Sequence, residues 1–192
     1  MNLEQARRLR DVLLDSDTAP PPELHGLVES AVLVPLYVRD GDLHAVFIRR
    51  GSDLRTHAGQ ISFPGGREEP GDRDLFATAL RETTEEIGLY PEAVTLLGAL
   101  SPVTVRASGF ALYSFVAAIE RPAKWMPAAT EVDAILELAL AELARSYAVQ
   151  TVRRAARNIV TPTFDAGGEL LWGATARILT DLLIRVGLLG AG

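Results

Sequence analysis

The stretch RETTEEIGL, residues 81 to 89, contains three closely spaced glutamates: Glu82, Glu85 and Glu86. On an α-helix this spacing brings the three carboxylates onto one side, with Glu82 within about 60° of each of the others. Projection of residues 74 to 87 places an apolar arc nearly opposite them, formed by Phe76, Leu80, Thr83 and Ile87. The segment therefore predicts a helix that packs on a core through one side and presents an acidic side.

The acidic side of this helix has two interpretations. Like charges at this spacing repel by roughly 0.2–0.5 kcal/mol per pair, which a solvated surface helix tolerates. Alternatively, the carboxylates form a site for Mg²⁺ or Mn²⁺, because hard divalent cations take oxygen ligands and would cancel the repulsion. The sequence also predicts the helix ends: Asp72 or Asp74 can cap its start, and Gly88 is well placed to end it.

The remaining pattern mixes strands and helices without a strict βαβ repeat, which favours a mixed sheet covered by helices in a single domain, residues 1–192. Two Val- and Ile-rich runs flank Asp40-Gly41 and predict a β-hairpin. The other expected strands are 61–63, 93–100, 110–119, 131–138 and 156–161. The other expected helices are 3–15, 139–146 and 172–187, and residues 1–22 comprise the first of these and a Pro-rich connector.

Composition excludes several kinds of site. The 192 residues contain no cysteine, so disulfides, thiol catalysis and cysteine-ligated zinc are excluded. The net charge of −6 and the lack of a long basic run argue against nucleic acid as a partner. The longest apolar run, residues 31 to 38, is too short to span a bilayer, and the charged start lacks a signal-peptide core. We expect a soluble cytoplasmic protein with no membrane partner.

The loop before the acidic helix is basic and glycine-rich. Between residues 49 and 67 there are four arginines and one acid, Asp53; the arginines are Arg49, Arg50, Arg55 and Arg67. Arg recognises phosphate bidentately, and Gly65 and Gly66 let the backbone approach a ligand closely. Together, the basic loop, the Gly-Gly turn and the acidic helix predict a site that binds a polyphosphate beside a metal ion.

Residues 66–89, GREEPGDRDLFATALRETTEEIGL, resemble a Nudix box, whose general pattern is G-x5-E-x7-R-E-x2-E-E-x-G. The core from Arg81 to Leu89 is intact. Gly66 stands one residue too far upstream, and Asp72 is the acid nearest to the first glutamate of the pattern. The departure concerns that first glutamate and leaves the metal-binding helix untouched.

The segment FIRRGSDLRTHAGQISFPGG, residues 47–66, is similar to the signature of the coenzyme A pyrophosphatase subgroup, R-[SA]-x3-R-x3-G-x3-F-P-G-G. Arg50, Arg55, Gly59 and the run Phe63 to Gly66 match it, whereas Gly51 replaces the usual Ser or Ala. The one-residue lengthening of the box and the segment LLWGATARIL near the C-terminus also resemble this subgroup.

This resemblance implies a Nudix α/β/α sandwich with a central mixed sheet. It implies Mg²⁺- or Mn²⁺-dependent hydrolysis of coenzyme A or its derivatives to 3′,5′-ADP and 4′-phosphopantetheine. Glu82 and Glu86 carry over as the main metal ligands, with Glu85 as ligand or base. Arg50, Arg55, Arg67, Gly65 and Gly66 are expected to bind the substrate.

Several assignments stay open. The general base is Glu85, Glu120 or Glu131, and Arg106 is an outside candidate for the 3′-phosphate of coenzyme A. His57 either donates to a phosphate or serves as an ordinary hydrogen-bonded loop residue. Alternative functions are hydrolysis of ADP-ribose, a dinucleotide or an oxidised nucleotide, and non-catalytic nucleotide binding. A homodimer is compatible with the sequence.

Overall fold

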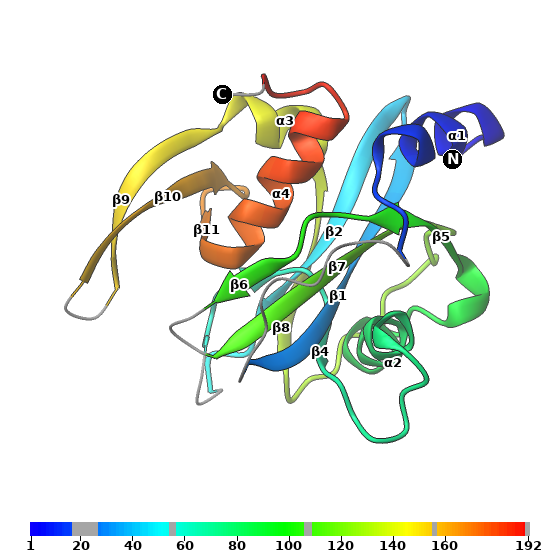
Figure 1. Cartoon of the computed structure of the whole chain (residues 1–192), viewed down its shortest axis with the longest axis horizontal. Helices are drawn as coiled ribbons and strands as arrows, with labels where there is room; N and C mark the ends of the chain where they lie inside the picture. Colours follow the sequence, from blue (N-terminus) through cyan, green and yellow to red (C-terminus); the bar gives the residue numbers. More distant parts are fainter. Residues whose placement is uncertain (17–26, 54–56, 106–108, 155–156, 191–192) are drawn as a thin grey trace.

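The computed structural model describes residues 1–16, 27–53, 57–105, 109–154 and 157–190. An eight-stranded sheet lies between α2 on one face and α1, α3 and α4 on the other, as Figure 1 shows. The predicted α/β/α sandwich with a central mixed sheet is confirmed. None of the helices in the described ranges is long and apolar enough to cross a membrane.

The elements follow the predicted order closely. The helices are α1 (Leu3–Val12), α2 (Leu75–Ile87), the 3-10 helix η1 (Pro91–Ala93), α3 (Leu140–Arg145) and α4 (Gly173–Arg185). The strands of the large sheet are β1 (Val28–Arg39), β2 (Asp42–Arg50), β3 (Ile61–Ser62), β4 (Gly65–Arg67), β5 (Val94–Ala99), β6 (Val103–Val105), β7 (Phe110–Ile119) and β8 (Val132–Ala139). The predicted hairpin around Asp40-Gly41 is the β1–β2 pair.

Strand β1 organises the large sheet. It pairs in parallel with β7 over nine residues, and every other strand pair in this sheet is antiparallel. Along its opposite edge, β1 pairs with β4 through Ser30 to Val32 and with β2 through Leu36 to Arg39. The Gly65-Gly66 turn is therefore built into the sheet, next to the strand that carries Arg50.

The core lies on both faces of β1, which explains why its sequence is apolar almost without interruption. Ala31 and Leu33 pack with Ala79 and Ile87 of α2. Side chains of the alternate positions, among them Val34, pack with α4 and the other helices of the opposite face. Strand β1 is thus buried on both faces, and its contacts with Ala79 and Ile87 hold α2 against the sheet.

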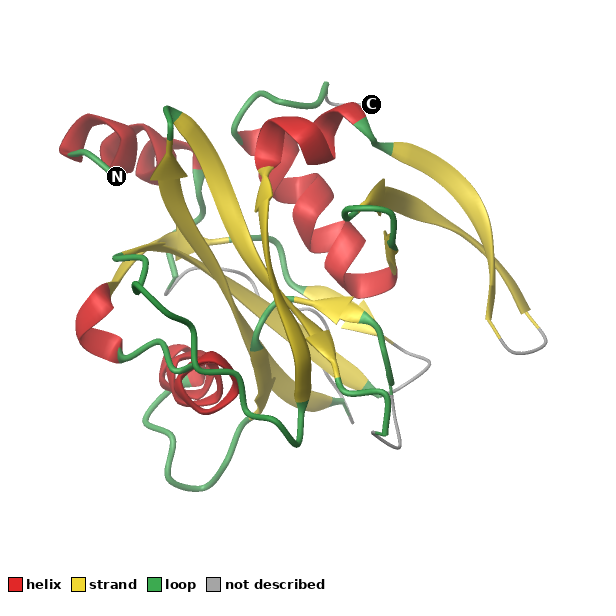
Figure 2. Ribbon diagram, turned by 180° about the vertical axis from the view of Figure 1, so that it is seen from behind, coloured by secondary structure: helices red, strands yellow, loops and turns green. Residues whose placement is uncertain are grey.

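A second, three-stranded sheet stands beside this body in the order β11-β10-β9. Its strands are β9 (Ala148–Arg154), β10 (Arg157–Asp165) and β11 (Leu170–Trp172). The predicted strand near residues 156–161 corresponds to β10, whereas β9 has no counterpart among the expected elements. Strands β9 and β10 project from the molecule as a hairpin in both views (Figures 1 and 2).

Candidate active site

Helix α2 begins and ends at sequence-encoded caps. The Asp74 side chain accepts a hydrogen bond from the Ala77 N–H at 2.7 Å, which satisfies one free donor of the first turn. Gly88 ends the helix in the left-handed conformation, with φ of 69°, which costs glycine little. One N-cap candidate and the C-cap are thus confirmed, and the register of the three glutamates is fixed.

Glu86 does not face solvent, in contrast to the acidic side expected from the helical projection. Only 2 % of the residue is exposed. Its Oε2 accepts a hydrogen bond from the Gly65 N–H at 2.9 Å, and its Oε1 lies 3.4 Å from Arg50 Nη1. Burial raises the pKa of Glu86 to about 7, although Gly65 and Arg50 oppose the rise. The carboxylate is thus held in a site where a cation is favoured.

Glu82 lies against the second glycine of the turn. A Cβ atom added at Gly66 would stand 2.3 Å from Cδ of Glu82, so a larger residue at this position would displace the Glu82 carboxylate. Burial raises the pKa of Glu82, and the nearby charge of Arg81 opposes the rise. Because the glycines have no side chains, the Gly-Gly turn leaves room for the acidic side chains of α2 and for a ligand.

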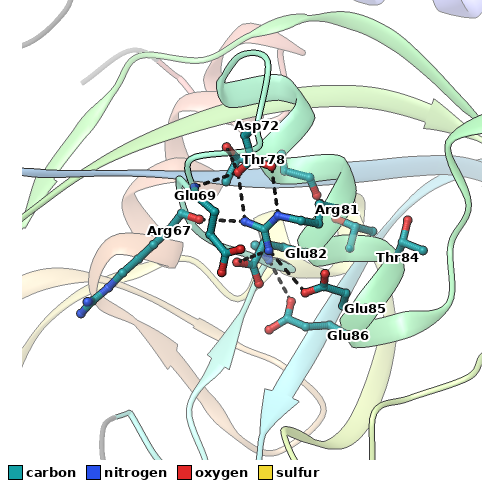
Figure 3. Close-up of polar contacts among 12 residues, drawn as sticks. Arg67, Glu69, Asp72, Thr78, Arg81, Glu82, Thr84, Glu85 and Glu86 are labelled. Carbon is teal, nitrogen blue, oxygen red and sulfur yellow. Dashed lines mark hydrogen bonds and ion pairs between the residues drawn. The ribbon is translucent and has the colours of Figure 1, made fainter.

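Asp72 explains how the irregular start of the box is accommodated. Its carboxylate accepts hydrogen bonds from Arg81 Nε at 3.0 Å and from Arg81 Nη2 at 3.1 Å (Figure 3). These bonds, together with bonds from the Glu69 N–H and the Thr78 hydroxyl, hold the pKa of Asp72 well below its usual range despite burial. Asp72 orients Arg81, a role that its place in the sequence did not reveal.

Arg81 joins the acidic helix to the β4 strand. Its Nη2 donates to the Arg67 carbonyl at 2.9 Å, while Nη1 lies 3.1 Å from Glu82 and 3.4 Å from Glu85. The Glu85 side chain is 60 % exposed, far more than Glu82 or Glu86. The three carboxylates thus form a gradient from buried Glu86 to exposed Glu85.

The predicted basic residues separate into different places. Arg50 reaches Glu86, whereas Arg49 pairs with Glu169 at 2.6 Å. Arg67 points away from the glutamates in Figure 3, and its guanidinium lies 4.7 Å from the ring centre of Phe110.

Two other predicted arginines, Arg55 and Arg106, lie outside the described residues. His57 pairs with Gln60 at 2.7 Å, as an ordinary loop histidine does.

Glu131 is brought to the site by the segment after β7. This segment crosses the end of α2, where the Ala128 N–H donates to the Glu86 carbonyl at 2.9 Å. The Glu131 carbonyl then accepts from the Gly51 N–H at 2.8 Å. Burial is the main cause of the raised pKa of both Glu82 and Glu86, and the negative charge of Glu131 adds to it. Glu120 begins the same segment, directly after β7, and its N–H donates to the Ala93 carbonyl at 2.8 Å.

The donor set fits a hard divalent cation. Glu82 and Glu86 supply carboxylate oxygens from adjacent turns of α2, and burial disfavours leaving both charges without a cation. Within the described ranges, no three His, Asp or Glu side chains are already arranged around one point. Arg81 and Arg50 occupy carboxylate oxygens that a cation would bind, so metal binding and these ion pairs compete.

Comparison with known proteins establishes the family to which this chain belongs. The profile of the NUDIX domain matches residues 28–159. The chain belongs to the Nudix family. Nudix hydrolase NudL of Pectobacterium atrosepticum is 34 % identical over 184 residues, which cover 93 % of this chain and 94 % of that protein. NudL of Salmonella paratyphi B is 35 % identical over 162 residues, 83 % of each chain. This Nudix chain is accordingly a hydrolase of nucleoside diphosphate derivatives.

A solved structure supports the same fold. RenU, a Nudix hydrolase from M. smegmatis, superposes with a TM-score of 0.52 at 17 % identity, covering 62 % of this chain and 75 % of that one. Nudix enzymes generally need divalent metal ions, in agreement with the donor set of α2. The names of the NudL relatives state no substrate.

Proposed function

We propose that this Nudix hydrolase cleaves the pyrophosphate bond of coenzyme A or its derivatives, giving 3′,5′-ADP and 4′-phosphopantetheine. One observation carries the proposal: Glu86 contacts both Arg50 and Gly65. These two residues belong to the segment that resembles the coenzyme A pyrophosphatase signature, and they come from opposite ends of it. These contacts support the proposal that the signature and the acidic helix form one site, in which a diphosphate lies between arginine and carboxylates.

In this proposal, Glu82 and Glu86 hold Mg²⁺ or Mn²⁺, and Glu85 adds a third carboxylate. When bound there, a divalent ion would neutralise diphosphate charge and lower the pKa of a water molecule, which would supply the nucleophile. Arg50 and Arg55 neutralise charge on the phosphates, and the Gly65-Gly66 backbone gives the diphosphate room beside α2.

Two acidic residues are candidates for the general base. Glu85 is exposed and belongs to the helix, whereas Glu131 comes from the segment that crosses the end of α2 and acts electrostatically on Glu82 and Glu86. We favour Glu131, because Glu85 is engaged by Arg81 at 3.4 Å. Arg67 is assigned to the nucleoside end of the substrate, because its guanidinium lies over Phe110 and away from the carboxylates.

A second candidate is hydrolysis of another nucleoside diphosphate derivative, such as ADP-ribose, a dinucleotide or an oxidised nucleotide. Non-catalytic nucleotide sensing is the third, and it is disfavoured because all three glutamates of the helix are present.

The test is a substrate panel with product identification in Mg²⁺ and in Mn²⁺. Coenzyme A, acetyl-coenzyme A, ADP-ribose, diadenosine polyphosphates and oxidised nucleoside triphosphates are compared by kcat/KM. We expect coenzyme A or its thioester to rank first and to release 3′,5′-ADP. A higher kcat/KM for ADP-ribose would reject the coenzyme A assignment, and no hydrolysis of any compound would reject the enzymatic function.

A further inference from the structure

The hairpin that projects from the body has no role in the proposed reaction. We define the arm as the paired residues Ala148–Arg154 and Arg157–Thr163. The third strand, β11, pairs only with Thr163 to Asp165, at the base of the arm. Beyond that point the arm is a two-stranded ribbon, and such a ribbon is marginally stable in water unless another surface covers it.

Both faces of the arm expose branched apolar side chains. Val160 is 72 % exposed and Val149 58 %, and the register places both on one face. Ile159, 38 % exposed, lies opposite Val152 on the other face. A sheet in a monomer usually buries one face and exposes polar groups on the other. Apolar groups on both faces indicate that a protein surface covers the arm.

The outer edge of the arm is also open. In the described part of the fold, β9 pairs with β10 alone. Its first five residues, AVQTV, contain neither a charged residue nor a proline of the kind that blunts an edge strand, and the two arginines stand at its end. The edge can therefore accept backbone hydrogen bonds from another chain.

Charge is strongly segregated between the arm and the remaining chain. Residues 148 to 163 carry three arginines, Arg153, Arg154 and Arg157, and no acid. The other residues contain 16 of the 19 basic side chains and all 25 acidic ones, so they carry a net charge of −9. The acidic body of a second copy thus complements the basic arm.

We propose that the arm is the dimerisation element of this protein and that its partner is a second copy of the chain. The partner's acidic body receives Arg153, and its apolar surface covers Val149 and Val160. In a two-fold dimer each copy contributes one arm, so the two contacts form together and self-association closes at two chains. An acidic polymer such as nucleic acid would satisfy the arginines but would leave the valines and Ile159 uncovered.

The experiment is sedimentation velocity of the full chain over the micromolar range. The parent is expected to be a dimer, and Val160→Glu is expected to weaken association at least about tenfold while the melting temperature of the folded chain stays close to the parent value. Leu3→Glu is the matched control, because Leu3 is 92 % exposed on α1 and the same charge is added there. This control is expected to remain dimeric.

Arg153→Glu provides a second variant at an exposed position should Val160→Glu unfold. It is expected to weaken the dimer, and the dimer of the parent is expected to weaken as salt is raised. A monomeric parent throughout the range, or dimers of both variants as tight as the parent's, would overturn the proposal. A monomer that shifts single-stranded oligonucleotides through Arg153 would overturn it in favour of an acidic polymer.

Discussion

The Gly65 N–H donates a hydrogen bond to Glu86 Oε2 at 2.9 Å, joining the glycine turn of β4 to the acidic helix α2. The same carboxylate lies 3.4 Å from Arg50 at the end of β2. One buried side chain therefore holds three separate elements in register around the proposed diphosphate site. Its loss should affect chemistry far more than folding, because each element is also fixed by the sheet or the core.

Glu86→Gln tests this relationship directly. Glutamine keeps an oxygen acceptor for the Gly65 N–H but removes the negative charge that a divalent ion requires. We expect kcat to fall at least about 100-fold, or ~2.7 kcal/mol in the barrier, while circular dichroism and the melting temperature stay close to the parent. Mn²⁺ binding followed by electron paramagnetic resonance should weaken in parallel. A variant that turns over like the parent would remove Glu86 from the site, and Glu92→Gln is the exposed control.

Gly66→Ala tests the close contact between the turn and the helix. The new Cβ would stand 2.3 Å from Cδ of Glu82, so either this carboxylate or β4 must move. We expect kcat/KM to fall at least about tenfold, because displacements near 1 Å at a catalytic group are costly. Gly71→Ala is the matched control, since no atom lies within 4 Å of a Cβ added there. Equal activities of the two variants would contradict the geometry.

Arg55→Ala tests the phosphate contact expected from the signature segment. Loss of a charge-assisted hydrogen bond should raise KM for coenzyme A about tenfold or more, with a much smaller change in the free energy of unfolding. Arg7→Ala, at an exposed position of α1, is the control. Unchanged KM and kcat in the Arg55 variant would discard its role in substrate binding.

Glu137 gives the fold a dependence on acid pH. Burial alone would raise the pKa of Glu137, but hydrogen bonds from Arg121, Tyr37 and Trp125 outweigh it and lower the pKa to about 2. Because the folded pKa is below the unfolded one, the stabilisation is complete above about pH 5 and is lost as the pH falls toward 2.

Urea unfolding of the parent and of Glu137→Gln measures this effect. At pH 7 the variant should lose roughly 2–3 kcal/mol of the free energy of unfolding, and the difference should shrink steadily below about pH 4. A difference that does not change with pH would show that packing, rather than the charge of Glu137, stabilises the segment.

The sequence determined the local structure of this protein. Asp74 and Gly88 set the ends of α2, because capping and the left-handed conformation depend on neighbouring residues only. The alternation of apolar residues around Asp40-Gly41 similarly determined the β1–β2 hairpin. From the spacing of the glutamates and the arginine-rich loop, a metal-binding helix facing a phosphate site stays a prediction, whereas membership of the Nudix family is confirmed.

Packing in three dimensions adds Glu86 to the buried residues of α2 and brings the charged side chains together. Helical projection placed Glu86 outside, but packing of β4 against α2 buries it, since β4 is positioned by its pairing with β1. Strand β9 of the projecting hairpin also escaped prediction, whereas a strand near β10 was expected, because the residues of β9 lack a core-facing period of their own. Strand pairing and burial depend on residues far apart in the chain, and a local sequence pattern does not specify which distant segment will pack against a given side chain.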